Sequence, residues 1–413
     1  MASIKQYSLN KNLAWNAAGY GIILVAVLFF IFTIRPGHDW GGDFGLYIQH
    51  AINIATGAPY ADSGFVLNPK NLFLSPHAYP PVFPVFLAPV YHFFGIDIHA
   101  MKVAGIIVFA LFLLLFSRYA RNRLESPLLY VLLVAALAFS PSFWESKDRI
   151  LPDYLFILLF YATIMIVDRL SAVKQPFVKQ LPTVLLAALL VCLVYGTRSL
   201  GLLIVPALLF HDFVRFRRIS RATAVIAVLF VIYYFAQNAA LQIDKSYFEA
   251  LVQVDPVMEG AVPDDVGPSV DADTAGQDWL GLLKENLSIL EKRIPYKLEV
   301  YARILSKYWY IGRNDHIGAI LFFIMTAIAL YGFVAKISRS PSFGDYLVLS
   351  YVMVLVVVPF EQDRYILPLI PLYLLYIFHG MELVYGYGVK AGAGMVAAVS
   401  YTHLTLPTIV REC

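Results

Sequence analysis

Long apolar runs constrain the fold of this chain more than any other feature. The segments GIILVAVLFFIFTI and VAGIIVFALFLLLF contain no charged residue, and similar runs recur along the 413-residue sequence. Hydrophobic residues make up 60% of the chain and charged residues only 14%, whereas soluble domains carry about 25% charged residues. One soluble core cannot bury so many apolar segments. The sequence therefore predicts an all-α polytopic membrane protein.

About ten membrane spans fit the apolar pattern. They are expected near residues 17–34, 101–117, 128–141, 153–167, 181–196, 199–210, 222–241, 316–334, 345–360 and 364–379. A further apolar run covers residues 79–95, but it contains four prolines, at positions 80, 81, 84 and 89. Proline disfavours a regular helix interior. We therefore predict a juxtamembrane or re-entrant element there.

The basic residues of the short loops predict the orientation. They alternate so that one face of the membrane receives Arg118–Arg123, Arg169–Lys179, Arg215–Arg221 and Lys336–Arg339. Cytoplasmic loops are enriched in Lys and Arg, so that face is expected to be cytoplasmic. The opposite face receives a first external loop, 35–100, and a long external loop, 242–315. No small-residue cleavage site follows the first apolar run, so it is expected to be retained.

The predicted membrane domain is single and covers residues 1–400. Within its long loop, residues 252–278 are acidic and rich in Gly and Pro, which predicts a mobile loop. Residues 279–311 alternate apolar with charged side chains, which predicts amphipathic helices at the membrane surface, interrupted at Pro295. The tail 401–413 does not continue the membrane pattern. We expect it to be artefactual and the natural chain to be longer.

The stretch HDWGGDFGLYIQHAINIATG follows the first span. From Asp43 onward its apolar residues repeat at helical spacing, and Gly57 suits the position after a helix C-terminus. Asp43 then lies at the helix start. It is either only a helix cap or a base placed to accept a proton from a hydroxyl group. Asp39, nearer the span end and without helix context, is the alternative base.

Two arginines are candidates for anion binding. Arg198, in YGTRSLGLLIVP, stands between two apolar runs with no acid nearby in the sequence. An ionisable residue at membrane depth costs about 2.5–3.5 kcal/mol on insertion scales, which favours a functional role over an interfacial anchor. Arg364, in PFEQDRYILPLIPLY, is flanked by Asp363 and is either half of a local ion pair or a second cation of the site.

The loop WESKDRILPD adds further charges on the same face. Asp153 follows a proline and opens a span, so it is a helix cap or a site residue. Lys147 and Arg149 are either solvated charges or part of the site. A carboxylate beside guanidinium groups suits a phosphate, because the guanidinium fork donates two parallel hydrogen bonds. The combination suggests a lipid phosphate as leaving group, attacked by a hydroxyl. We expect no metal, because no Cys and His cluster has ligand spacing.

The ordered set GGDFGLYIQHAINIATGAPY, YPPVFP, LPDYLFILLF, TRSLGLLIVP and DRYILPLIPLY, within residues 1–380, resembles the GT-C superfamily of integral membrane glycosyltransferases. The nearest groups are the protein O-mannosyltransferases, the aminoarabinose transferases and the polyprenol-phosphate-mannose-dependent mannosyltransferases. The resemblance implies a multi-pass protein of a bacterial or archaeal plasma membrane with an extracytoplasmic site. It implies a polyprenyl-phosphate sugar as donor, a hydroxyl on a glycan, lipid or protein as acceptor, no cofactor and no nucleic acid.

The same resemblance implies roles for individual residues. Asp43 would be the base of an inverting transfer, although Phe44 stands where members often have Glu, which keeps Asp39 as the alternative. The donor phosphate would be bound by Arg198, Arg364, Lys147 and Arg149. The substrate pocket would include Tyr47, Asp153, Tyr79 and Tyr365.

The alternative function is a lipid-linked glycan polymerase or a flippase-type transporter. It would also need arginines on the external face. A transporter is expected to have broken or polar helices at mid-membrane and two related halves, and the sequence shows neither feature. A third possibility is a non-catalytic membrane scaffold, in which these charges are only caps and anchors.

Overall fold

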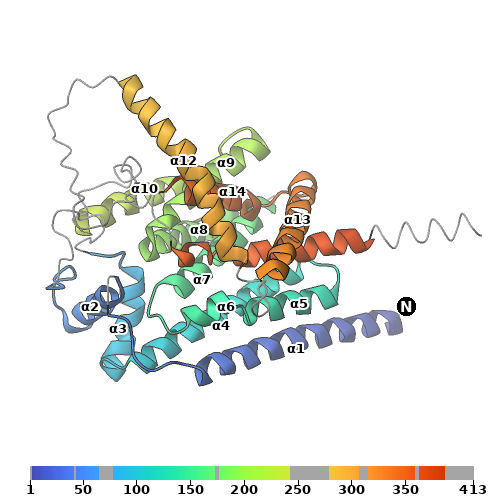
Figure 1. The fold of residues 1–413 in the computed structure, drawn as a ribbon, viewed down its shortest axis with the longest axis horizontal. Coiled ribbons are helices and arrows are strands. Elements are labelled where there is room, and N and C mark those ends of the chain that lie inside the picture. Colours follow the sequence, from blue (N-terminus) through green and yellow to red (C-terminus); the bar gives the residue numbers. More distant parts are fainter. Residues whose placement is uncertain are drawn as a thin grey trace, which may run out of the picture.

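The computed structural model describes residues 2–40, 43–64, 78–172, 176–241, 279–306, 315–358 and 362–386. Within these ranges the chain is helical and contains no β-strand, which confirms the predicted all-α class. The helices pack side by side into one bundle, with the start of α1 at one end and α2 and α3 at the other (Figure 1). The expected mobile loop 252–278 and the tail 401–413 lie outside the described residues.

The longer helices are α1 (Ala2–Phe32), α4 (Ile98–Arg121), α7 (Asp153–Ala172), α8 (Phe177–Thr197), α9 (Ile204–Phe216), α10 (Arg221–Leu241), α12 (Trp279–Ser306) and α13 (Asp315–Arg339). The shorter elements are α2 (Asp43–Thr56), α3 (Val82–Phe94), α5 (Pro127–Ala138), α6 (Pro141–Ser146), α14 (Phe343–Val357) and the 3-10 turns η1 (Ser199–Leu203) and η3 (Asp363–Ile366). Helical backbone also runs over 370–386.

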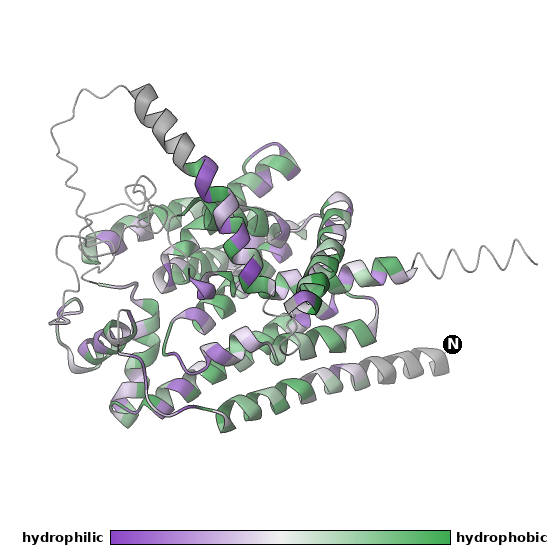
Figure 2. Ribbon diagram, viewed as in Figure 1, coloured by the Kyte–Doolittle hydropathy of each residue, from purple (hydrophilic) through white to green (hydrophobic). Residues whose placement is uncertain are grey.

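Eight helical stretches in the described part of the chain are long and apolar enough to cross a membrane. Two of them combine short elements, namely α5 with α6 and η1 with α9. The first eight predicted spans coincide with these stretches, whereas the last two, 345–360 and 364–379, fall on shorter helical segments, α14 and residues 370–386. Figure 2 shows the apolar character of the bundle helices. The last predicted span begins later than expected. A 3-10 turn occupies the region around Arg364, and regular helix starts only at residue 370. Pro368 and Pro371 have no N–H to donate inside a helix, whereas a proline is tolerated in the first turn, where Pro371 lies.

The proline-rich run 79–95 forms α3, which has only 13 residues. A helix of that length is about 20 Å long, whereas the hydrocarbon core of a bilayer is about 30 Å thick. It therefore cannot cross, as predicted for a juxtamembrane element. It packs along α2, where the ring of Phe83 lies 5.4 Å from that of Tyr47.

The predicted interruption of the amphipathic segment at Pro295 is wrong. α12 runs unbroken through this residue. Proline removes one backbone hydrogen bond from a helix, but packing of the inner face offsets that loss. Arg293, Lys297 and Tyr301, spaced four residues apart, are buried there against the bundle. α12 contacts α14, α13 and η3 and crosses α14 in Figure 1.

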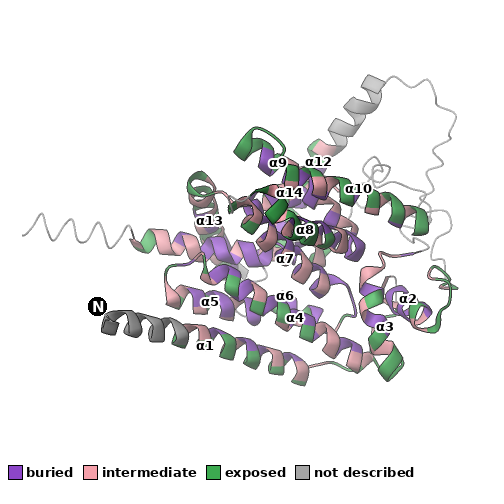
Figure 3. Ribbon diagram, turned by 180° about the vertical axis from the view of Figure 1, so that it is seen from behind, coloured by how far each residue is buried: buried purple, intermediate pink, exposed green. Residues whose placement is uncertain are grey.

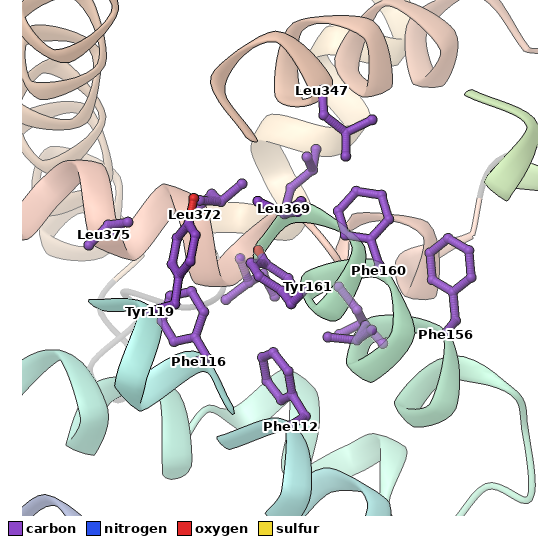
Figure 4. Close-up of a cluster of buried hydrophobic side chains, with 14 of the residues drawn as sticks. Phe112, Phe116, Tyr119, Phe156, Phe160, Tyr161, Leu347, Leu369, Leu372 and Leu375 are labelled. Carbon is purple, nitrogen blue, oxygen red and sulfur yellow. The ribbon is translucent and has the colours of Figure 1, made fainter. Parts of the chain in front are cut away.

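The centre of the bundle is a layer of aromatic and leucine side chains. Phe112 and Phe116 of α4 pack against Tyr161 of α7. Phe160 and leucines of α14 and the last helix continue the layer (Figure 4). The Tyr161 hydroxyl donates to the Pro368 carbonyl at 2.8 Å. Buried residues lie between the helices and exposed residues on the outer faces (Figure 3). Many of the exposed residues are large and apolar. In a membrane protein such faces contact lipid tails.

Two glycines allow the last helix to approach α13 closely. A Cβ atom on Gly332 would lie 2.8 Å from the backbone nitrogen of Gly380 and nearer still to the Tyr376 carbonyl oxygen. A Cβ atom on Gly380 would lie 2.9 Å from Cγ2 of Ile328. Small residues at a crossing let two membrane helices come into backbone contact. This crossing therefore fixes how the last helix packs against α13.

We expect Gly332→Ala to destabilise the bundle, because the added methyl meets backbone atoms that cannot rotate away. Overpacking of this kind costs about 1–3 kcal/mol. Thermal unfolding of the protein in detergent micelles measures the effect as a lower Tm. Gly386→Ala is the matched control, because a Cβ there meets nothing within 4 Å. Equal Tm values for both variants would contradict the close crossing.

Candidate active site

Two aspartate–arginine pairs lie at the end of the bundle that carries α2 and α3. Asp43 is in the first turn of α2, and its Oδ2 accepts a hydrogen bond of 2.6 Å from Nη2 of Arg364 in η3. Asp153 is in the first turn of α7, and its Oδ1 accepts a hydrogen bond from Nη1 of Arg198 at the end of α8. The partners are 321 and 45 residues apart in the sequence.

The two pairs form one electrostatic unit. Burial lowers the pKa of Arg364, but the charges of Asp153 and Asp43 outweigh that effect and raise its pKa above the ordinary value. Asp153 therefore acts on Arg364 as well as on its own partner. We refer to Asp43, Asp153, Arg198 and Arg364 as the charge cluster. The structure thus brings together the four side chains that topology predicted to share one face.

The charge cluster is largely removed from solvent and formally neutral. Asp153 is 4% exposed and Arg198 is 8% exposed, while the side chains of Asp43 and Arg364 are 17% and 11% exposed. Both arginines have acidic partners that are distant in the sequence. Arg198 does have an acidic partner, supplied from a distant helix. Arg364 bonds to Asp43 rather than only within its own turn. The sequence around each arginine does not reveal its acidic partner, because the two residues of each pair come together only when the helices pack.

Aromatic rings surround the Arg198 guanidinium. Its Cζ lies 5.2 Å from the ring centre of Tyr365 and 5.8 Å from that of Phe156. Cation–π contacts of this kind hold a guanidinium in place without neutralising it. The Tyr351 hydroxyl donates to the Tyr365 carbonyl oxygen at 3.0 Å, which anchors η3 to α14. Tyr365, predicted to line the substrate pocket, therefore lies beside one of the cations.

Tyr47 is a buried tyrosine beside the charge cluster. It lies one turn after Asp43 on α2 and is 4% exposed. Burial raises its pKa well above the ordinary tyrosine value, and the Asp43 charge raises it further, against the opposing effect of Arg198 and Arg364. Its ring lies 4.9 Å from the ring of Tyr79. Two of the three tyrosines predicted for the pocket are therefore neighbours.

A histidine network that the sequence did not reveal holds Tyr79 in position. The Tyr79 backbone N–H donates to Nε2 of His50 at 3.3 Å, so Nδ1 carries the proton and donates to the Tyr60 carbonyl oxygen at 2.9 Å. Burial lowers the pKa of His50, which favours the same neutral ring. The Tyr60 hydroxyl donates to the Tyr79 carbonyl oxygen at 2.7 Å. The only sequence signal was a histidine on the polar side of α2.

The structure does not bring Lys147 and Arg149 into the charge cluster. Nζ of Lys147 donates to Oδ2 of Asp148 at 2.5 Å, and its side chain is fully buried. Arg149 is exposed in the turn before α7. Asp39, the alternative base, is exposed in the segment before α2, whereas Asp43 faces both predicted cations. The geometry therefore favours Asp43.

α12 places two further cations over this end of the bundle. Arg293 and Lys297 are 0% and 1% exposed, and Nη1 of Arg293 donates to the Val357 carbonyl oxygen at 3.0 Å. α12 also contacts η3, which carries Arg364. Sequence reasoning assigned this helix to the membrane surface. The sequence did contain a signal for this pair. Arg293 and Lys297 are four positions apart, a spacing that places two side chains next to each other on one face of a helix.

Among the described residues, no group of three or more His, Cys, Asp or Glu side chains is arranged to hold a metal ion. The expectation that the protein needs neither a metal nor another cofactor stays a prediction.

No protein-family model and no curated protein matches this sequence, but solved structures do match the fold. ArnT from Cupriavidus metallidurans, solved bound to undecaprenyl phosphate, aligns with a TM-score of 0.52 and 14% identity over 95% of this chain and 65% of its own. The archaeal oligosaccharyltransferase AglB from Archaeoglobus fulgidus, solved with an inhibitory peptide and a dolichol-phosphate, aligns with a TM-score of 0.50 and 13% identity.

The chain therefore shares the fold of these two proteins, which agrees with the fold that the sequence resemblance implied. The alignment with AglB covers 92% of this chain but only 52% of AglB. This chain thus spans about half the length of one neighbour and about two thirds of the other. A shared fold at such low identity does not carry an activity with it, so function must be argued from the charge cluster.

We expect Asp43 and Arg364 to be energetically coupled. Asp43→Asn and Arg364→Gln should each lower the free energy of unfolding, because each leaves the other charge buried without its partner. The double variant should lose less than the sum, by about 1.5–3 kcal/mol. A double-mutant cycle on unfolding in detergent measures this coupling.

The matched control is the pair Glu299 and Arg303, whose side chains are 69% and 67% exposed. A pair spaced four residues apart on an exposed helix face couples by only about 0.3–0.5 kcal/mol. Coupling as small as this between Asp43 and Arg364 would mean that their contact contributes no more than a surface ion pair.

Proposed function

We propose that this protein is a glycosyltransferase that moves a sugar from a polyprenyl-phosphate carrier to an acceptor hydroxyl. The observation that carries the proposal is the charge cluster, in which a carboxylate and two guanidinium groups meet at one end of a membrane bundle. The GT-C fold supports it, since two neighbours with this fold were solved with undecaprenyl phosphate and with a dolichol-phosphate.

The donor phosphate binds to Arg198 and Arg364. Each guanidinium offers a planar set of N–H donors that match phosphate oxygens, and each is held in the resting protein by one carboxylate. An arriving phosphate competes with these carboxylates for the same donors. When Arg364 turns to the phosphate, the Asp43 carboxylate loses its cation and becomes a better proton acceptor. Donor binding thereby activates the base.

The reaction is a single displacement at the anomeric carbon. The acceptor oxygen attacks that carbon while Asp43 removes the hydroxyl proton, and the bond between the carbon and the phosphate oxygen breaks. The two arginines stabilise the charge that develops on the leaving polyprenyl phosphate. Asp153 orients Arg198, and the buried Tyr47 lies beside the base. One displacement inverts the anomeric configuration.

The site lies at the extracytoplasmic face of a bacterial or archaeal plasma membrane. The support is the distribution of basic residues, because the loops at the opposite end of the bundle carry Arg118–Arg123 and Arg215–Arg221. The prenyl chain of the donor lies in the bilayer, and the acceptor hydroxyl belongs to a glycan, lipid or protein.

The arrangement of the helices favours a transferase over a transporter. Transporters bind their substrates near mid-membrane between discontinuous helices. Here α4, α7 and α10 run without a break, and the charge cluster lies at helix ends. A lipid-linked glycan polymerase remains the second candidate. The two functions differ in their donor, which is a polyprenyl-phosphate sugar for the transferase and a lipid-linked glycan for the polymerase.

We expect Asp43→Asn to abolish sugar transfer from a polyprenyl-phosphate sugar by the purified protein, because the amide cannot accept the hydroxyl proton. The variant should bind polyprenyl phosphate at least as tightly as the wild type, since the neutral amide no longer competes with the phosphate for Arg364. Asp39→Asn is the matched control and should remain active. An active Asp43→Asn together with an inactive Asp39→Asn would show that Asp39 is the base.

We expect Arg198→Ala to weaken binding of free polyprenyl phosphate about ten- to hundredfold, since a charge-assisted hydrogen bond contributes about 1.5–3 kcal/mol. Arg198→Lys should lose less, because it keeps the charge but not the paired donors. Equilibrium binding of the lipid without sugar isolates the phosphate contact. If Arg198→Ala and Arg364→Ala both bind it like the wild type, these arginines only anchor the fold.

Cysteine labelling of intact cells tests the orientation. In a background with Cys192 and Cys413 replaced by Ser, a membrane-impermeant thiol reagent should label Arg149→Cys and not Asn122→Cys. Both positions are exposed and lie at opposite ends of the bundle. Labelling of position 122 alone would place the charge cluster on the cytoplasmic side.

A further inference from the structure

A second group of cations lies near α6, outside the charge cluster. Arg35, Lys102 and Lys147 surround the carboxylate of Asp148, with nitrogen–oxygen distances of 3.7, 3.9 and 2.5 Å. Among the described residues, Asp148 is the one carboxylate within ion-pair distance of these three cations. The group therefore carries three positive charges and one negative charge, a net +2.

The two lysines are fixed parts of this group. Their side chains are 2% and 0% exposed. Nζ of Lys102 donates to the carbonyl oxygens of Arg35 and Gly37 at 2.8 and 2.7 Å, and Nζ of Lys147 lies 4.6 Å from the ring centre of Trp144. Neither lysine can turn away to solvent, so both charges stay in place whatever binds nearby.

Arg35 faces outward from the same group. Its side chain is 60% exposed, and its guanidinium carbon lies 4.8 Å from the Trp144 ring centre. A cavity of about 190 Å³ opens beside it, lined by Arg35, Lys102 and His99 and by the apolar side chains of Ile34, Pro36 and Ile98. No residue of the charge cluster lines this cavity. It is therefore a separate, positively charged recess.

The recess lies where the spans end and apolar surface begins. α1 ends at Phe32 and α4 begins at Ile98, so the cavity is level with the boundary of the membrane. On α1, directly before the recess, Phe32 and Val25 are 84% and 58% exposed. On α4, Ile107 is 53% exposed. A ligand with an anionic head and hydrocarbon tails matches both parts of this surface.

We propose that this recess binds the phosphate head group of an anionic membrane phospholipid, with its acyl chains along α1 and α4. Unbalanced positive charge at the end opposite the basic loops runs against the usual distribution, and an anionic lipid offsets it. The volume suffices, because a water molecule occupies about 30 Å³ of liquid and a phosphate group is only a few times larger.

The lipid would also help to order the segment that leads to Asp43. The backbone N–H of Arg35 donates to Oδ1 of Asp148 at 2.8 Å, and Lys102 holds the carbonyl oxygens of the same short segment. A head group bound to Arg35 stabilises these contacts from the open side. The inference stands without the proposed function, because it rests on residues outside the charge cluster.

The test uses the full-length protein reconstituted in nanodiscs of phosphatidylcholine alone or mixed with phosphatidylglycerol. Phosphatidylglycerol that remains bound after extraction is measured by native mass spectrometry. We expect wild-type protein to retain it and Arg35→Gln to retain roughly five- to tenfold less, the effect of one lost charge-assisted contact near a membrane. Arg303→Gln removes an arginine of α12 whose side chain is 67% exposed, compared with 60% for Arg35, and should bind like the wild type.

Three results would overturn the inference. Equal retention by wild type and Arg35→Gln would mean that the recess binds no lipid. Displacement of the lipid by inorganic phosphate at comparable concentration would mean that the tails contribute nothing. Loss of free polyprenyl phosphate binding in Arg35→Gln would assign the recess to the donor site instead. Binding of polyprenyl phosphate should be unchanged in this variant, whether or not the protein proves to be a transferase.

Discussion

The buried pairing of Asp43 with Arg364 and of Asp153 with Arg198 is the interaction on which the rest of the site depends. Charged side chains in a low-dielectric bundle are costly unless they have partners. The two pairs therefore tie the start of α2 to η3 and the start of α7 to the end of α8. The aromatic contacts of Arg198 and the His50 network then place Tyr365, Tyr79 and Tyr47 around these fixed charges.

The same pairing gives the proposed reaction its order. A neutral cluster is stable without substrate, and a phosphate can enter only by taking donors from the carboxylates. Competition for Arg364 then links donor binding to the exposure of Asp43 as a base. Such a link would protect the site from proton transfer before the donor is present. The cationic recess lined by Arg35 and Lys102 has its own carboxylate, Asp148, and does not take part in this exchange.

Local patterns were enough to predict the elements but not their partners. Apolar runs predicted the spans, prolines predicted the short α3, and helical spacing predicted α2 with Gly57 after its end, where the structure has a φ of +74°. The partner of Arg198 could not be predicted, because its acid lies 45 residues away and meets it only through helix packing. The continuity of α12 through Pro295 likewise depends on tertiary contacts of its inner face.

The most direct test of the central claim is a structure of the protein with polyprenyl phosphate bound. We predict that the phosphate oxygens lie within hydrogen-bond distance of Arg198 and Arg364, and that Nη2 of Arg364 has left Oδ2 of Asp43, to which it donates at 2.6 Å without donor. The Asp43 carboxylate would then face the open side of the phosphate. A bound phosphate elsewhere in the bundle, with both aspartate–arginine pairs intact, would contradict the account.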